Sequence, residues 1–155
     1  MIRYAVSFWD YTILQRYRDY TDDKDMDMRT FEFRASGNNR DGLVLKAACD
    51  SLLERPEEHK ILIVLSDGRP CDMSVNRPGT RRPSVYTGEV AVRDTTYEVR
   101  KARAAGISVL GIFAGDNEDL TVEKKIYGKD FAYIRNISNF SNVVGTYLKK
   151  QLEME

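Results

Sequence analysis

The sequence predicts an α/β fold of the three-layer, Rossmann-like kind, in which a mostly parallel sheet is flanked by helices. Two largely apolar runs, at residues 60–65 and 107–113, are typical of parallel strands that are covered on both faces. Segments with helical periodicity alternate with these runs, and such alternation implies a parallel sheet with helices on both sides. Ligands of such sheets gather beyond the carboxyl ends of the strands, so functional side chains are expected there.

The N-terminal quarter of the chain predicts two strands and a polar loop. Residues 2–9 are rich in aromatic and branched side chains and predict a buried strand. Residues 22–27 are acidic and predict a solvated loop, because they lack the glycine and the final glutamate of a calcium-binding loop. Residues 30–33 alternate in polarity and predict a short edge strand.

A helix and the clearest strand of the sequence follow. Four apolar residues share one helical face, namely Val44, Ala47, Ala48 and Leu52. Pro56 closes this helix. The strand at residues 60–65 then runs into Ser66, Asp67 and Gly68. Residues 69–93 form a polar insertion that is longer than most connections in compact domains.

The C-terminal half predicts two more helices and two more strands. Asp94 or Thr95 caps a helix that ends at Gly106, directly before the strand at residues 107–113. Residues 131–134 form a short last strand. Ser141 caps a final helix that turns three residues toward the sheet, namely Val144, Tyr147 and Leu148.

Composition favours one domain over residues 1–155 and narrows the classes of function. The 24 basic and 24 acidic side chains cancel, so no overall field attracts nucleic acid or an anionic membrane. No apolar run approaches the roughly 18 residues of a membrane span, and no signal peptide is recognisable, which favours the cytoplasm. Cys49 and Cys71 lie in no metal-binding or redox pattern, and the only histidine, His59, lies among charged residues.

Asp67 is the most informative residue, because it follows a strand whose apolar character would not place a charge there. A buried carboxylate at this position must be hydrogen-bonded, paired or bound to a metal. Residue chemistry alone leaves turn capping and metal binding equally open. Gly68 allows a sharp turn after Asp67, and Ser66 offers a supporting hydroxyl.

Asn39 and Asp41 place a second polar group in the turn before the first clear helix. Asp41 next to Gly42 is suited to capping the helix, where a negative charge is favoured. In a doubly wound sheet, however, this turn and the end of the Asp67 strand lie at the same edge. Oxygen donors of this kind suit Mg²⁺, Ca²⁺ or Mn²⁺ rather than Zn²⁺.

These residues carry a resemblance to von Willebrand factor A (VWA) domains. Residues 60–68 resemble the strand and Asp-Gly turn of that family, and residues 37–48 resemble the loop and helix before it. The nearest likeness is to the cobaltochelatase subunit CobT type and the nitric oxide reductase activation protein NorD type. It is carried by residues 39–42, 53–56, 60–70 and 86–95.

The resemblance implies a metal-ion-dependent adhesion site (MIDAS) of which this sequence has only a part. Asp67 matches the last element of the family's site, Asn39 matches the threonine position, and Asp41 is an alternative donor. The DxSxS motif that follows the family's first strand occurs nowhere, so the first, central strand and its helix are absent from the pattern. We therefore expect either direct re-pairing of the flanking strands or completion of the sheet by another chain, for example in a homo-oligomer.

The resemblance implies a non-catalytic module that binds a protein partner through Mg²⁺ or Mn²⁺ and works beside an AAA+ ATPase. An acidic side chain of the partner would fill the open metal position, and the incomplete motif predicts weak metal affinity. One alternative is a metal-free structural fragment. Another is a metal-dependent hydrolase or phosphotransferase, which is disfavoured because the chain lacks a phosphate-binding glycine loop, a nucleophile and a general base.

The insertion at residues 69–93 has two interpretations. It is a solvated loop, or it forms a basic surface near the site through Arg69, Arg77, Arg81, Arg82 and Arg93. Acidic partner segments suit such a surface better than nucleic acid, because aromatic residues are sparse between the arginines.

Overall fold

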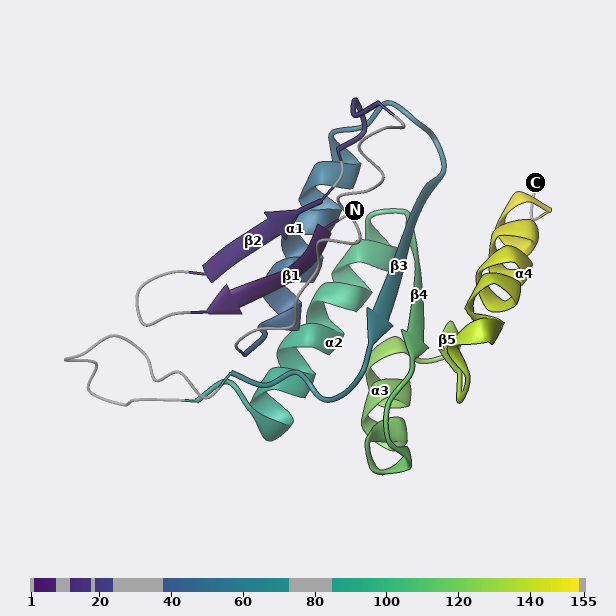
Figure 1. The fold of residues 1–155 in the computed structure, drawn as a ribbon. Coiled ribbons are helices and arrows are strands. Elements are labelled where there is room, and N and C mark those ends of the chain that lie inside the picture. The colour runs from purple at the N-terminus through teal and green to yellow at the C-terminus, as the bar shows by residue number, and fades with distance from the viewer. Residues whose placement is uncertain (1, 8–11, 18, 24–37, 73–84, 154–155) are drawn as a thin grey trace.

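The strands of the computed structural model form two separate sheets (Figure 1). The structure describes residues 2–7, 12–17, 19–23, 38–72 and 85–153. β1 (Ile2–Ser7) and β2 (Thr12–Arg16) form an antiparallel pair. β3 (Lys60–Ser66), β4 (Ile107–Phe113) and β5 (Phe131–Tyr133) form a parallel sheet in that order. The predicted α/β class and the three predicted parallel strands are confirmed.

The N-terminal hairpin agrees only in part with the sequence prediction. β1 begins at the predicted residue, while residues 8–11 lie outside the described part of the chain. β2 was not foreseen, because its mixed side chains show no alternation and its extended form comes from pairing with β1, with Ser7 opposite Thr12. The predicted strand at residues 30–33 and most of the acidic loop also lie outside the described residues.

Helices cover both faces of the parallel sheet, as predicted (Figure 1). α1 (Asp41–Leu53), α2 (Gly88–Ala104) and α3 (Leu120–Tyr127) pack on one face. α4 (Phe140–Leu152) packs on the other, where Tyr147 meets Leu110 and Ile112 of β4. No helix among the described residues is long and apolar enough to cross a membrane.

α2 begins at Gly88, six residues before the predicted cap at Asp94. Thr87 is the N-cap residue, and both predicted caps lie inside the helix. Thr95 is fully buried and donates a hydrogen bond to Ala91 O at 2.9 Å. Asp94 accepts one from the Tyr86 hydroxyl at 2.8 Å. The side chains of Asp94 and Thr95 therefore form hydrogen bonds within the fold and do not cap a helix. The predicted start of this helix was wrong.

The C-terminal third differs from the prediction at two places. α3 was not foreseen, since its eight residues are too few to show a clear helical period. Ile126 and Tyr127 anchor it in the core. The predicted cap of the last helix at Ser141 is wrong, because α4 begins at Phe140 with Asn139 as its N-cap. Asn136 instead caps the preceding 3-10 turn by accepting from Ser138 N at 3.0 Å.

β3 is an edge strand of its sheet within the described chain, and β1 does not pair with it. Of the two predicted alternatives, direct re-pairing of the flanking strands is therefore wrong, and completion of the sheet by another chain stays a prediction. α1 packs against both β1 and β3 and so holds the hairpin beside the parallel sheet without a ladder between them. β3 stays partly exposed along its length, whereas six of the seven residues of β4 are buried.

Candidate functional site

Asp67 lies at the carboxyl end of β3, where the sequence placed it. Its side chain is exposed rather than buried, and it accepts no hydrogen bond from the part of the chain that is described. Ser66 closes the turn instead: its hydroxyl donates to Gly68 O at 2.8 Å and accepts from Gly68 N at 3.4 Å. Asp67 is therefore not needed for the turn, which leaves its carboxylate available for an external ligand.

Asn39 and Asp41 lie at the start of α1 and contact each other. Asn39 Nδ2 donates to Asp41 Oδ1 at 2.5 Å, and the N-cap residue of α1, Arg40, makes no side-chain cap. Desolvation raises the pKa of Asp41 to about 6, the Asn39 hydrogen bond opposes this rise, and the negative charge of Asp67 adds to it. Asp67 therefore acts electrostatically on Asp41, and we call the region of these two carboxylates the acidic corner.

Glu123 is a buried acid at this corner that the sequence interpretation missed. It lies in the first turn of α3, is 1% exposed, and neither of its carboxylate oxygens has a hydrogen-bond partner. Desolvation raises its pKa to about 8, and the charges of Asp41, Asp119 and Asp67 add to the rise, whereas the nearby Ser66 side chain lowers it. Because α3 was not foreseen, nothing in the sequence set Glu123 apart from surface glutamates.

A buried polar cluster fixes the loop that carries Asn39 and Asp41. Asp72 is fully buried and pairs with Arg40, whose Nε lies 2.6 Å from Asp72 Oδ2. Asp72 and Tyr86 form an antiparallel bridge, with Asp72 N donating to Tyr86 O at 2.6 Å and Tyr86 N donating to Asp72 O at 3.0 Å. The Arg40 guanidinium also lies over the Tyr86 ring, 5.5 Å from its centroid. Both ends of the long insertion are thus tied to the loop before α1.

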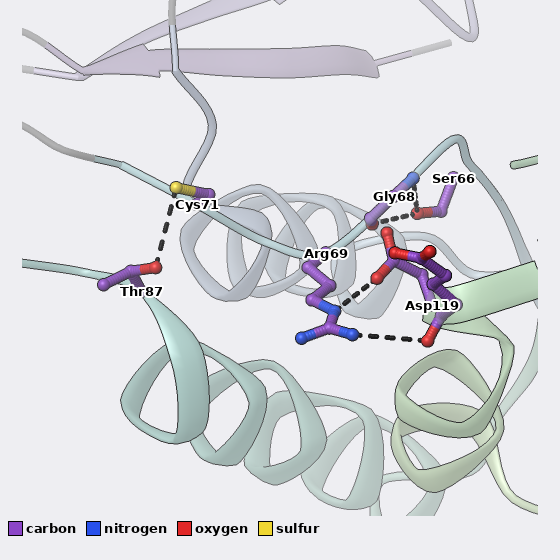
Figure 2. A network of polar contacts seen from close by, with 7 residues as sticks. Ser66, Gly68, Arg69, Cys71, Thr87 and Asp119 are labelled. Carbon is purple, nitrogen blue, oxygen red and sulfur yellow. Dashed lines mark hydrogen bonds and ion pairs between the residues drawn. The ribbon is translucent and has the colours of Figure 1, made fainter. Parts of the chain in front are cut away.

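Arg69 joins the end of β3 to the start of α3 (Figure 2). Its guanidinium pairs with Asp119 and donates to Glu118 O at 3.2 Å. Farther along the same segment, Cys71 Sγ donates to Thr87 Oγ1 at 3.7 Å. Of the arginines predicted to form a basic surface, Arg69 therefore has an acidic partner within the chain, and Arg77, Arg81 and Arg82 lie outside the described residues.

The acidic corner fits a divalent cation only in part. Beside Asp41, Glu123 offers a buried carboxyl group without a hydrogen-bond partner, and Asp67 offers an exposed carboxylate. Among the described residues, however, no group of three or more His, Cys, Asp or Glu side chains could hold a metal ion. Any ion here would need further oxygen donors from water or from a partner.

The parallel sheet, its two helical layers and an aspartate at the carboxyl end of an apolar strand define a VWA-like α/β module. A family model described as "Cobalamin biosynthesis protein CobT VWA domain" matches residues 21–88. That match extends from the segment after β2 through α1 and β3 to the start of α2, and therefore includes Asn39, Asp41 and Asp67. Residues 21–88 are thus similar to a VWA domain of the CobT type, and the predicted resemblance is confirmed.

The comparison with curated proteins gives a partial relative. "Uncharacterized protein YojO" of Bacillus subtilis (strain 168) is 29% identical over 119 residues, which cover 74% of this chain. The match covers 17% of the length of that relative. No solved structure shows a significant match.

Proposed function

We propose that the chain is a non-catalytic protein-interaction module, and that its partner binds at the acidic corner beyond the carboxyl end of β3. The observation that supports this most is the exposed Asp67 carboxylate, which the turn of its own strand does not use. Mg²⁺ or Mn²⁺ is the proposed cofactor, held by Asp67 with Asn39 and Asp41. Ser66 supports the turn that positions Asp67.

The ion would bridge two surfaces rather than activate a substrate. With few donors from this chain, it keeps coordination positions open, and an acidic side chain of the partner is the natural oxygen donor for them. The fixed loop before α1 holds Asn39 and Asp41 in place, because the Arg40–Asp72 pair anchors it to the chain after β3. Weak affinity for the metal alone follows from the small donor set.

The family description and the resemblance suggest the setting in which the module works. The description names cobalamin biosynthesis, and CobT-type and NorD-type proteins imply metal-chelatase or enzyme-activation machinery with an AAA+ ATPase. We extend this setting to the present chain as a proposal, with a cytoplasmic location and with an acidic target protein beside the ATPase. A metal-free scaffold is the alternative, supported by the absence of a three-acid metal group among the described residues.

Calorimetric titration with Mn²⁺ and Mg²⁺ tests the proposed site. We expect binding with a Kd near the millimolar range, as for other sites with few protein donors. Asp67→Ala should abolish the heat of binding, because the variant removes the exposed carboxylate that is proposed to hold the ion. Since Asp67 is exposed, the variant should retain its fold, which circular dichroism checks.

Asp50→Ala is the matched control, since it removes an exposed carboxylate from α1, about two turns away from Asp41. It should bind Mn²⁺ as the unmodified chain does. Equal binding by all three proteins would show that the ion sits elsewhere, and no binding by any of them would favour the metal-free scaffold.

A further inference from the structure

The outer face of α2 exposes two large apolar side chains in one line. Val90 is 61% exposed and Tyr97 is 62% exposed. They lie seven residues apart, which is close to two turns of a helix, so both side chains point to the same side. The residues that bury α2 against the core point elsewhere, and they are Ala91, Val92, Thr95, Thr96, Val99 and Ala102. Because tyrosine is enriched in protein interfaces, an exposed line of this kind favours a protein partner.

Two exposed arginines continue this line. Arg93 and Arg100 alternate with Val90, Tyr97 and Ala104, so that the five residues follow a spacing of three and four. That spacing defines the seam along which one helix packs against another in a coiled coil. All five residues are exposed, and we call them the α2 seam. The seam extends over about four turns of the helix and is about 21 Å long.

The α2 seam carries two positive charges that are available to a partner. The acids of α2 have other contacts: Glu89 pairs with Lys125, Asp94 accepts from the Tyr86 hydroxyl, and Glu98 pairs with Lys101. Among the described residues, neither Arg93 nor Arg100 takes part in an ion pair. A guanidinium binds a carboxylate through two parallel hydrogen bonds, which makes arginine well suited to an acidic interface. Acidic side chains of a partner therefore complement the seam.

We propose that the α2 seam binds an acidic amphipathic helix of a partner protein. Apolar residues of that helix pack on Val90 and Tyr97, and its Asp or Glu side chains pair with Arg93 and Arg100. None of these four residues belongs to the acidic corner, so the proposal does not depend on a metal ion there. The family match ends at residue 88 and does not include this face of α2.

Two other occupants fit the α2 seam less well. In a symmetric pair of this chain the same residues meet, so arginines would lie close to arginines, and like charges disfavour that contact. Single-stranded nucleic acid suits a surface on which several aromatic side chains stack with successive bases, whereas Tyr97 is the one aromatic residue of the seam. An acidic helix matches both the apolar and the charged residues.

Two designed helical peptides of about three heptads test the proposal by fluorescence anisotropy. One has leucine at the first seam position of each heptad and glutamate at the fourth, and the other has lysine in place of the glutamate. We expect the glutamate peptide to bind at least tenfold more tightly than the lysine peptide. Tyr97→Ala should weaken this binding at least tenfold and retain the fold in circular dichroism, because Tyr97 is exposed. Ile137→Ala is the control, since Ile137 is 63% exposed and precedes α4.

Reversal of the seam charge gives the sharpest result. The double variant Arg93→Glu, Arg100→Glu should prefer the lysine peptide, because attraction and repulsion change places. This reversal separates recognition from a loss of folding, which would weaken the binding of both peptides. Lys150→Glu makes the same kind of charge change on α4, which covers the other face of the sheet, and should leave the preference unchanged.

Equal binding of the two peptides, no binding by either, or a double variant that keeps the original preference would overturn the proposal. Tighter binding of a single-stranded RNA oligonucleotide than of the glutamate peptide would replace it with a nucleic acid surface. A dimer in light scattering that Tyr97→Ala converts to a monomer would replace it with an interface between copies. Asp67→Ala should leave peptide binding unchanged, so loss of Mn²⁺ binding and loss of peptide binding report on two separate proposals.

Discussion

Gly111→Ala should destabilise the protein by about 3 kcal/mol or more, because it overpacks the core. Gly111 lies in the middle of β4, and a methyl group there would overlap the Tyr127 ring from α3. Tyr127 is 2% exposed and packs within the main core cluster, so its ring has no free space into which to move. Urea denaturation gives the change in the free energy of unfolding.

Gly145→Ala is the matched control for this prediction. Gly145 lies inside α4, and a methyl group there would meet no atom within 4 Å. Alanine should stabilise the helix by roughly 0.5–1 kcal/mol, since glycine loses more backbone entropy on folding. Equal stability of the two variants would contradict the packing of α3 on β4.

Glu123→Gln should remove a large pH dependence of stability. The pKa of Glu123 is raised from 4.5 to about 8 in the folded protein. Between these values the folded state keeps a proton that the unfolded state has lost, so stability falls as the pH rises through this window. The loss is at most about 1.4 kcal/mol per pH unit. Glutamine stays neutral, so the variant should gain stability relative to the unmodified chain between pH 5 and pH 8.

We expect that relative gain to reach about 2–4 kcal/mol at pH 8, measured by urea denaturation at both pH values. Asp41, whose pKa is raised to about 6, contributes a fall of the same sign in both proteins. Glu89→Gln on the exposed start of α2 is the control and should follow the unmodified chain. Parallel pH profiles for the Glu123 variant and the unmodified chain would contradict the burial of this carboxyl group.

The parallel strands were predictable because their apolar runs carry the signal locally. β3 and β4 show such runs in the sequence. The apolar face predicted for α1 was only partly right, because Leu45, Ala48 and Cys49 are its buried apolar residues, whereas Val44 and Ala47 are half-buried. β2 and α3 could not be foreseen, since pairing and packing with distant residues stabilise them. The beginning of α2 was misplaced because Asp94 resembles a cap, although it binds the Tyr86 hydroxyl.

Only part of the candidate site could be predicted from the sequence, namely the residues that match the family motif next to a predicted strand or helix. Asp67, Asn39 and Asp41 are predicted to lie together, because parallel strands direct their carboxyl ends to the same edge. The exposure of Asp67 was not predicted, since it depends on Ser66 closing the turn. Glu123 could not be found without α3, and the edge position of β3 depends on the separation of the two described sheets.

Amide hydrogen exchange along β3, followed by NMR, tests most directly the claim that this strand is an edge of the described sheet and ends in the site. Alternate residues of a parallel strand bond to the same neighbour, so the amides of Leu62, Val64 and Ser66 bond to β4 and should be protected. Those of Ile61, Ile63 and Leu65 should exchange much faster in the isolated chain, because none of the described strands lies beside them on that side. Equal protection of both sets would contradict the account and show that β3 already has a neighbour on each side.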